Sequence, residues 1–316
     1  MLDLSIVIPI YNEEIRLQKS LPIIKKFLEQ NKKNKIEIIF VSDGSNDNTN
    51  LIVEKFKSKN NKKLKIKFIK YKINVGKGYA VKKGILIAKN SWVLICDIDL
   101  SVHPKQLKNW YNKNLLKSKK EAYYGSREHN KSKVKASKYR VFLGYFFKKL
   151  IRFLFQINLS DTQCGFKVFN KYYSKKIFRK IKSYRFAFDV ELTILLNKNK
   201  IKIIELPLTW NHKSGSKLSI FKDIPRMILD IILIKLSFLF CLIPPTKQIS
   251  SSDIYFSNND FISFGLFWPS PSKVTIVLYL DFSIPFIREK LCPRFILLFI
   301  IITLSLYLFF KFCRTS

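Results

Sequence analysis

The stretch "VLICDIDLS", residues 93–101, places two aspartates one residue apart at the end of an apolar run. The run itself is typical of a strand that is buried on both faces, as in parallel sheets. Side chains two residues apart on an extended strand point the same way, so we expect Asp97 and Asp99 to share one face. Two carboxylates that close repel each other unless a cation lies between them. A solvated strand end is the ordinary alternative, and these residues alone leave both interpretations open.

Strand and helix patterns alternate on both sides of this stretch. Such alternation predicts an α/β fold with a central, mostly parallel sheet that is covered by helices on both faces. Apolar runs predict the strands 4–10, 35–43, 64–71, 91–99 and 121–127. Helical spacing of apolar residues predicts the helices 13–30, 48–59, 76–90 and 104–117.

The chain of 316 residues carries a formal net charge of +36, from 58 Lys and Arg against 22 Asp and Glu. Such an excess indicates a polyanionic partner, which could be nucleic acid, an anionic membrane surface or a phosphorylated substrate. The duller alternative is that the scattered lysines only solvate loops and helix faces. No nucleic-acid-binding module and no lysine stripe along one helix is recognisable, so we expect no nucleic-acid partner.

The five cysteines lie far apart and form no CxxC pair. This spacing favours a reducing compartment and argues against both a disulfide framework and a zinc ribbon. Only three histidines are present, and this composition argues against a histidine metal cluster. The N-terminus runs directly into a predicted strand, so we expect no signal peptide.

The second half of the chain is apolar and basic. Residues 139–157 combine aromatic side chains with Arg and Lys and contain no acid, which fits either a core helix or, as we favour, a helix lying in a membrane interface. We predict a catalytic domain at 1–219, an amphipathic interfacial helix at 220–245, an irregular linker at 246–292 and a C-terminal transmembrane anchor at 293–312. The alternative for this last, short apolar segment is a tail that packs on the domain.

Acidic and small residues follow two further predicted strands. "IVIPIYNEE" (6–14) ends the first strand, and "VSDGSNDNT" (41–49) ends the second. Each segment alone could be ordinary turn chemistry. The carboxyl ends of parallel strands meet at one edge of the sheet, where such folds bind ligands. Together with residues 97–99, the two segments therefore predict a ligand site suited to a nucleoside.

The order of motifs "IPIYNEE", "SDGSNDNT", "NVGKGYAVKKG", "DIDLS", "GSR", "DTQCGFKVF", "RFAFDVEL" and "GSKLS" resembles the inverting family-2 glycosyltransferases. Within that family the chain is similar to the branch of dolichyl-phosphate β-glucosyltransferases and related polyprenyl-phosphate glycosyltransferases. The resemblance covers about residues 3–242, and "DTQCGFK" after "GSR" is its most specific part. It implies a nucleotide-sugar-binding domain of the GT-A type, which agrees with the strand and helix alternation.

The resemblance also implies a role for each motif. Asp97 and Asp99 would bind the Mg²⁺ or Mn²⁺ that bridges the donor diphosphate, because these ions prefer oxygen ligands. The residues that would bind the donor are Pro9, Tyr11, Glu13, Asp43, Gly76, Lys77, Gly78, Asp97 and Asp99. At the end of the second predicted strand this sequence has Ser42-Asp43, where the family often has two acids.

The acceptor implied by the resemblance is a polyprenyl monophosphate, whose anionic oxygen needs positioning rather than a general base. Arg127, Arg140 and Lys217 would contact its phosphate, because cations at these positions match charge-assisted phosphate binding. Asp161 would orient the acceptor or the sugar, so that Asp99, Asp161 and Arg127 form the catalytic set. Asp189 and Glu191 would orient the sugar, although two acids at a helix start are also favoured by the helix dipole. Trp210 and His212 could stack on the sugar or be structural.

The expected activity is therefore transfer of a hexose, foremost glucose from UDP-glucose, to a membrane-borne polyprenyl phosphate with inversion. A related family-2 enzyme with another nucleotide-sugar donor, or with a non-lipid acceptor in cell-surface polysaccharide synthesis, is the alternative. A basic nucleic-acid-binding protein is the remote alternative, on the charge alone. We expect a membrane-associated enzyme whose catalytic domain faces the cytosol, where nucleotide sugars are made.

Overall fold

The computed structural model describes residues 1–60, 64–116, 118–135, 138–211, 213, 220–240, 261–265 and 277–281. The chain divides into two compact units, Met1–Phe240 and Cys241–Ser316. In the second unit the described residues form one antiparallel pair, β10 (Phe261–Gly265) with β11 (Val277–Asp281). This pair lies inside the stretch 246–292 that was expected to be irregular. The predicted anchor, 293–312, lies outside the described residues.

The first unit is built on a seven-stranded sheet in the order β3-β2-β1-β4-β7-β5-β8. Its pairs are parallel except those of β7, which runs antiparallel to β4 and β5. The strands are β1 (Asp3–Ile10), β2 (Lys35–Asp43), β3 (Lys65–Tyr71), β4 (Trp92–Ile95), β5 (Glu121–Ser126), β7 (Lys167–Asn170) and β8 (Lys202–Pro207). A small second sheet pairs β6 (Lys133–Lys135) with β9 (Thr209–Asn211). A mostly parallel central sheet is thus confirmed.

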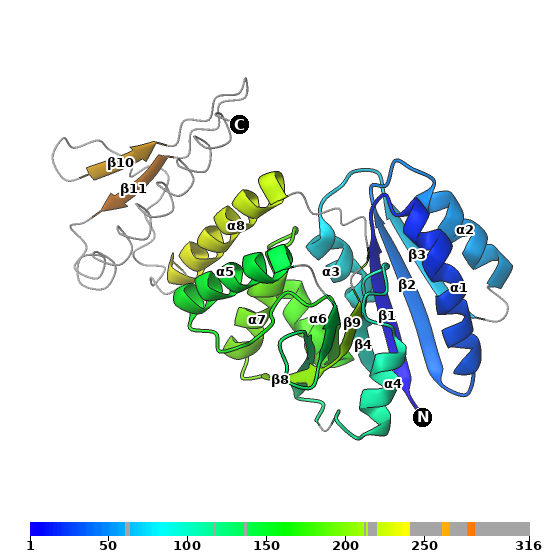
Figure 1. Ribbon diagram of the computed structural model, residues 1–316. Helices are drawn as coiled ribbons and strands as arrows, with labels where there is room; N and C mark the ends of the chain where they lie inside the picture. The colour runs from blue at the N-terminus through cyan, green and yellow to red at the C-terminus, as the bar shows by residue number, and fades with distance from the viewer. Residues whose placement is uncertain are drawn as a thin grey trace. The chain divides into compact units, whose positions relative to one another are not determined.

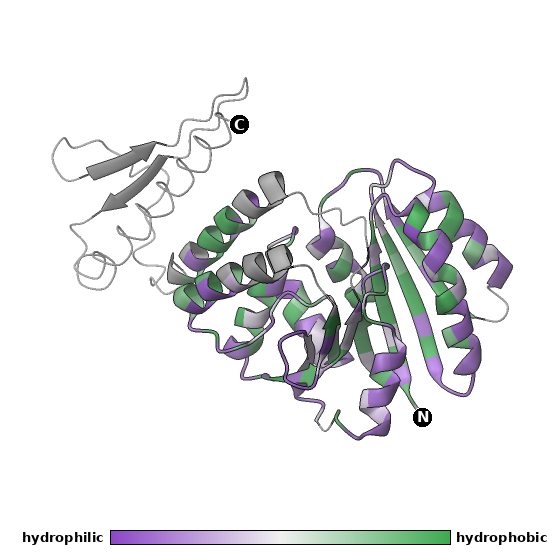
Figure 2. Cartoon of the chain, in the orientation of Figure 1, coloured by the Kyte–Doolittle hydropathy of each residue, from purple (hydrophilic) through white to green (hydrophobic). Residues whose placement is uncertain are grey.

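Helices cover both faces of the sheet (Figure 1). Consecutive residues of β1 alternate between two buried clusters, so that Ile6 and Ile8 belong to one cluster and Val7 to the other. The first cluster takes in side chains of α1 (Glu14–Gln30), α2 (Thr49–Asn60) and α4 (Lys105–Asn112). The second takes in side chains of α3 (Lys77–Ile87), α6 (Lys171–Lys180) and α7 (Phe188–Lys198). Figure 2 shows β1 and β2 as largely hydrophobic between these helices. Burial on both faces is the reason that these strands read as apolar runs.

The predicted fourth strand is wrong in its extent. β4 ends at Ile95, and the next residues form a turn in which the Leu100 N–H donates to the Asp97 carbonyl at 3.1 Å. Ile98 lies in the core, 2% exposed, and its carbonyl accepts from Ser20 Oγ at 2.6 Å. The two aspartates therefore lie in a turn that is anchored by the buried residue between them, and not on one face of a strand.

The two predicted apolar helices are present as α5 (Lys138–Phe155) and α8 (Ile220–Phe240). On α8, Met227, Ile231 and Ile234 are buried, whereas Leu229 and Leu233 on the opposite face are 40% and 47% exposed. In the part of the chain that the structure describes, none of the helices combines the length and apolarity needed to cross a bilayer.

Candidate active site

The Asp43 carboxylate organises the corner where β2 ends. Its two oxygens accept hydrogen bonds from the backbone N–H groups of Val75 (2.9 Å) and Gly76 (2.7 Å). Gly76 has φ of 128°, and a Cβ there would lie 2.4 Å from the Tyr184 carbonyl oxygen, so only glycine fits. Asp43 is 3% exposed and both of its oxygens are used, so it holds the loop that begins α3.

Lys77, the first residue of α3, reaches back to the turn after β4. Its Nζ lies 2.7 Å from Asp97 Oδ1, and the two side chains are 26% and 37% exposed. Burial alone would lower the pKa of Lys77, but the charges of Asp97, Asp189 and Asp99 outweigh burial and raise it. The ammonium is therefore held in its charged form by the carboxylates around it.

Asp99 and Gly165 complete the surroundings of Asp97. Asp99 Oδ1 accepts the Ser101 N–H at 2.9 Å, which orients the Asp99 carboxylate within its turn. A Cβ on Gly165 would lie 2.1 Å from Asp97 Oδ2, so the backbone of the "DTQCGFK" segment runs directly against that carboxylate. We call Asp43, Lys77, Asp97 and Asp99 the acidic corner.

The acidic corner fits a hard divalent cation. Asp97 and Asp99 supply carboxylate oxygens, the ligands that Mg²⁺ and Mn²⁺ prefer. Within the described ranges, three or more His, Cys, Asp or Glu side chains nowhere gather as a metal-binding group. An ion at the pair would thus complete its shell with water or phosphate oxygens, as Mg²⁺ commonly does.

The end of β1 lies beside the acidic corner. Pro9 pairs with Val41 across β1 and β2, and the Tyr11 side chain after them is 37% exposed. Glu13 is 8% exposed, its N–H donates to Thr49 Oγ1 at 2.7 Å, and its carboxylate accepts from Arg16 Nη1 at 3.1 Å. The ends of β1 and β2 are therefore tied together.

Arg127 and Asp161 form a two-bond ion pair at the end of β5. Arg127 donates from Nε to Asp161 Oδ2 at 2.7 Å and from Nη2 to Oδ1 at 2.8 Å. Asp161 is itself held, because its backbone N–H and that of Ser160 donate to the Glu205 carboxylate, both at 2.9 Å. The Arg127 guanidinium also lies 6.0 Å from the centre of the Trp210 ring. Burial alone would raise the pKa of Asp161, but the charge and hydrogen bonds of Arg127 hold it below its usual range.

Lys167 and Asp189 form a second, more deeply buried pair. Lys167 Nζ lies 2.5 Å from Asp189 Oδ1, and the side chains are 1% and 7% exposed. The ammonium also donates to the Cys164 carbonyl at 2.7 Å and lies 4.9 Å from the centre of the Tyr124 ring. Burial, with Asp161 beside it, raises the pKa of the Cys164 thiol to about 12, so the group stays protonated near neutral pH. We call Arg127, Asp161, Lys167 and Asp189 the ion-pair cluster.

Glu191 holds a loop. Its carboxylate accepts from the backbone N–H of Lys182 at 3.0 Å and from that of Ser183 at 2.6 Å. Among the other predicted residues, Gly78 packs against Phe188, where a Cβ would lie 2.7 Å away. Arg140 belongs to α5, but its side chain lies outside what the structure describes, as do Lys217 and His212 altogether.

The structure adds to the site three residues to which the sequence patterns assign no role: Lys167, Gly165 and Glu205. Lys167 interrupts the otherwise apolar run "GFKVF", and a charge inside a buried strand needs a buried partner. That anomaly was the available signal for the Lys167–Asp189 pair. Gly165 and Glu205 carry no comparable signal, because their contacts arise between segments that are distant in the sequence.

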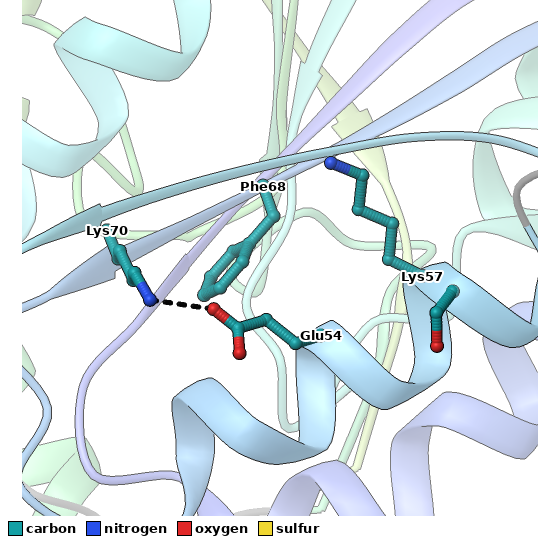
Figure 3. Close-up of a pocket in the computed structure, with 5 residues that line it drawn as sticks. Glu54, Lys57, Phe68 and Lys70 are labelled. Atoms are coloured by element: carbon teal, nitrogen blue, oxygen red, sulfur yellow. Dashed lines mark hydrogen bonds and ion pairs between the residues drawn. The ribbon is translucent and has the colours of Figure 1, made fainter.

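A pocket of about 400 Å³ opens elsewhere, between α2 and the edge strand β3 (Figure 3). Its lining residues are Glu54, Lys57, Ser58, Phe68 and Lys70. Lys70 Nζ lies 2.7 Å from Glu54 Oε1 across the pocket. None of these residues belongs to the acidic corner or to the ion-pair cluster.

Comparison with solved structures identifies the type of fold. The chain superimposes on glucosyl-3-phosphoglycerate synthase from Mycobacterium tuberculosis, solved with Mn²⁺, UDP and phosphoglyceric acid, with a TM-score of 0.53 at 15% identity over 88% of this chain and 87% of that one. It superimposes on mannosyl-3-phosphoglycerate synthase from Rubrobacter xylanophilus with the same TM-score at 14% identity, over 89% and 85% of the two chains. These likenesses confirm the predicted GT-A-type fold.

Sequence comparison finds more closely similar relatives. The chain is 35% identical to a dolichyl-phosphate beta-glucosyltransferase of Dictyostelium discoideum, over 75% of each chain. It is 33% identical to the enzymes of that name from Saccharomyces cerevisiae, over 78% of each chain, and from Homo sapiens, over 75% of this chain and 76% of that one. The family model for glycosyl transferase family 2 matches residues 5–178, which hold the acidic corner and the "DTQCGFK" segment. This chain therefore belongs to glycosyl transferase family 2.

Proposed function

We propose that this protein transfers glucose from UDP-glucose to a polyprenyl monophosphate of the dolichyl type, with inversion at the sugar. The observation that carries the proposal is the series of relatives named dolichyl-phosphate beta-glucosyltransferase, which match about three quarters of the chain at 33–35% identity. The acidic corner and the ion-pair cluster supply side chains that suit this reaction.

On the donor side, Asp97 and Asp99 hold Mg²⁺ or Mn²⁺, and the ion when bound neutralises charge on the departing nucleoside diphosphate. Asp43 acts indirectly, since its oxygens already hold the Val75 and Gly76 amides. It keeps the loop before α3 in place for the nucleotide. The residues proposed to contact the donor are Pro9, Tyr11, Glu13, Gly76, Lys77 and Gly78.

On the acceptor side, the phosphate oxygen is anionic at neutral pH and attacks without a general base. Arg127, together with Arg140 and Lys217, binds that phosphate. Asp161 is a positioning residue, because both of its oxygens already accept from Arg127. A bidentate carboxylate fixes the plane of the guanidinium and leaves donors on its other edge for phosphate.

The sugar is oriented from the start of α7. Asp189 Oδ1 accepts a hydrogen bond from Lys167 Nζ. The other carboxylate oxygen of Asp189 is proposed to accept a hydrogen bond from a sugar hydroxyl. Glu191 acts on the sugar only through the loop at residues 182–183, whose amides it already binds.

The lipid acceptor requires a membrane, and α5 and α8 offer a surface for it. Tyr145 and Phe153 on α5 are 51% and 61% exposed, and Lys149 lies 4.7 Å from the centre of the Tyr145 ring. Exposed apolar side chains beside cations match a helix lying in an anionic membrane interface. We propose that the catalytic domain binds the cytosolic face of a membrane through these helices, with residues 293–312 as an additional anchor.

The decisive experiment incubates membranes carrying the protein with radiolabelled UDP- and GDP-sugars and follows the label into the lipid phase. The proposal expects lipid label from UDP-glucose, dependent on a divalent cation and lost in Asp99→Asn. Lipid label from a different sugar would replace the proposed donor. Label that stays in the aqueous phase would contradict the lipid acceptor.

The variant Leu229→Asp/Leu233→Asp tests the proposed membrane-binding face of α8. Transfer to a long-chain acceptor in vesicles should fall, while transfer to a short-chain, water-dispersible acceptor should persist. Leu51→Asp is the matched control, because Leu51 on α2 is 49% exposed. Equal long-chain activity in the double variant and the control would contradict a docking role for α8.

A further inference from the structure

Lys77 is held at its backbone and extends a long, partly exposed side chain. The Asp43 carboxylate fixes the two amides that precede it, and Gly76 packs against the Tyr184 carbonyl. A lysine at the first residue of a helix faces the positive end of the helix dipole, which costs about 0.3–1 kcal/mol. The position thus gives α3 no stability, and the lysine gains its interaction from Asp97, 2.7 Å away.

In the turn after β4, the carboxylates of Asp97 and Asp99 outnumber the cations that lie beside them among the described residues. Among the described residues, the ion pairs give Asp97 one cationic partner, Lys77, and give Asp99 none. Asp99 is oriented by the Ser101 N–H, and Asp97 is confined by Gly165. In the described part of the chain, one ammonium therefore serves two acids, which leaves the turn with an excess of negative charge there.

A divalent cation at Asp97 and Asp99 competes with Lys77 for the same carboxylate, because Lys77 lies on Asp97 Oδ1. A nucleoside diphosphate that arrives with the ion offers the displaced ammonium a new anionic partner. We infer that Lys77 is an internal counter-ion, which holds Asp97 in the ligand-free enzyme and moves to the donor diphosphate when the divalent cation takes Asp97. This inference rests on the proposed function, since it assumes the metal and the nucleotide.

The exchange couples the two ligands. Lys77 opposes metal binding when no nucleotide is present and favours nucleotide binding once the metal is present. Coupling between two bound ligands is reciprocal, so the metal must raise nucleotide affinity by the same factor as the nucleotide raises metal affinity. Removal of the ammonium should therefore change the two affinities in opposite directions. A residue that only supports the fold would not produce that pattern.

The test is Lys77→Met, which keeps the aliphatic stem and removes the charge. We expect Mn²⁺ alone, measured by electron paramagnetic resonance, to bind about tenfold more tightly, because its competitor is gone. We expect UDP in saturating Mn²⁺, measured by calorimetry, to bind about tenfold more weakly, because a charge-assisted contact is lost. Lys77→Arg, which keeps the charge, should restore part of the UDP affinity.

Lys70→Met is the matched control. Lys70 lies 2.7 Å from a carboxylate oxygen of Glu54, the same separation as in the Lys77–Asp97 pair, and it lines the separate pocket of Figure 3. Its removal changes the net charge of the protein equally and should alter neither affinity. Equal shifts in both variants would assign the effect to overall charge and overturn the inference.

The inference and the proposed function fail in different ways. If the wild type binds Mn²⁺ neither alone nor with UDP, or if Asp99→Asn binds it as well as the wild type does, the metal site itself is wrong. If the wild type and Asp99→Asn behave as proposed but Mn²⁺ affinity in Lys77→Met is unchanged or lower, only the counter-ion role of Lys77 is overturned. Unchanged UDP affinity in Lys77→Met would overturn it as well.

Discussion

The acidic corner and the ion-pair cluster both place carboxylates beside cations, yet they differ in burial and in charge balance. In the cluster, each acid has its own cation. The Lys167 and Asp189 side chains are 1% and 7% exposed, and Asp161 is 5% exposed beside an Arg127 that is 35% exposed. In the acidic corner, Lys77 and Asp97 are 26% and 37% exposed, and Asp99 has no ion pair among the described residues. A buried, balanced pair is costly to break, whereas an open, unbalanced one can exchange its partner. The comparison teaches that the buried Lys167–Asp189 pair stabilises the frame of the site, whereas the Lys77–Asp97 pair is open enough to exchange a partner for a ligand.

The largest expected effect comes from opening the ion-pair cluster with Asp189→Asn. The Lys167 ammonium would remain buried without its counter-charge, which should lower the free energy of unfolding by about 3–5 kcal/mol. Denaturant unfolding measures this loss. The double variant Asp189→Asn/Lys167→Met removes both charges and should recover much of it. A single variant that stays within about 1 kcal/mol of the wild type would contradict the structural role of the pair.

The next effect comes from the acidic corner, where Asp99→Asn should abolish most transfer and leave the fold intact. Asparagine can still accept the Ser101 N–H, but it removes one of two carboxylate charges available to a metal. We expect the transfer rate to fall at least about a hundredfold, or about 2.7 kcal/mol. The thermal midpoint should stay that of the wild type. Near wild-type transfer in chelator-treated buffer would show that the corner holds no catalytic metal.

Gly165→Ala tests whether the "DTQCGFK" segment, which holds Asp161 and Lys167 of the ion-pair cluster, contacts the acidic corner at Asp97. The added Cβ would lie 2.1 Å from Asp97 Oδ2, and Gly165 is not among the described glycines with positive φ, so the backbone tolerates alanine. The carboxylate must shift, and Mn²⁺ affinity should fall about ten- to a hundredfold, as changes to the surroundings that orient a metal ligand typically cause. UDP binding without metal serves as the control. Unchanged Mn²⁺ affinity would mean that Asp97 relaxes freely.

The smallest effect is the acid sensitivity contributed by Asp161. Arg127 holds the pKa of this carboxyl below its unfolded value of about 3.8, so the pair stabilises the protein fully above that range. The stabilisation is lost as the pH falls below about 4 and through the lower folded pKa. The difference in unfolding free energy between the wild type and Asp161→Asn should therefore shrink from pH 5 to pH 3. A constant difference would show that the ionised carboxylate does not provide it.

Much of the fold follows from local patterns in the sequence. Apolar runs located β1, β2, β3 and β5, and helical spacing located α1, α2 and α3, each within a few residues of its bounds. Pro22 lies inside α1 without ending it. The motifs around residues 97–99 and 161–167 also indicated the family, which the relatives and the family model then showed. These features were predictable because each depends on residues that are neighbours along the chain.

Other features depended on tertiary structure. The turn at Asp97 and Asp99 was expected to be strand, but the buried side chain and carbonyl of Ile98 hold it against α1. β7 enters the sheet antiparallel between β4 and β5, an insertion that strand and helix alternation could not reveal.

The partner of each charged side chain was decided by the tertiary structure as well. The sequence by itself determined that acids follow the strands, that Arg127 follows β5 and that a lysine begins α3. Only the folded chain turned Asp43 toward the amides of Val75 and Gly76, Asp161 toward Arg127, and Lys77 toward Asp97. Periodicity records which face of an element is buried, whereas the partner of a charge is set by packing between segments 20 to 34 residues apart. Such contacts carry no local signature. Each of these side chains would fit its own helix, strand or turn equally well if its charged partner came from a different segment.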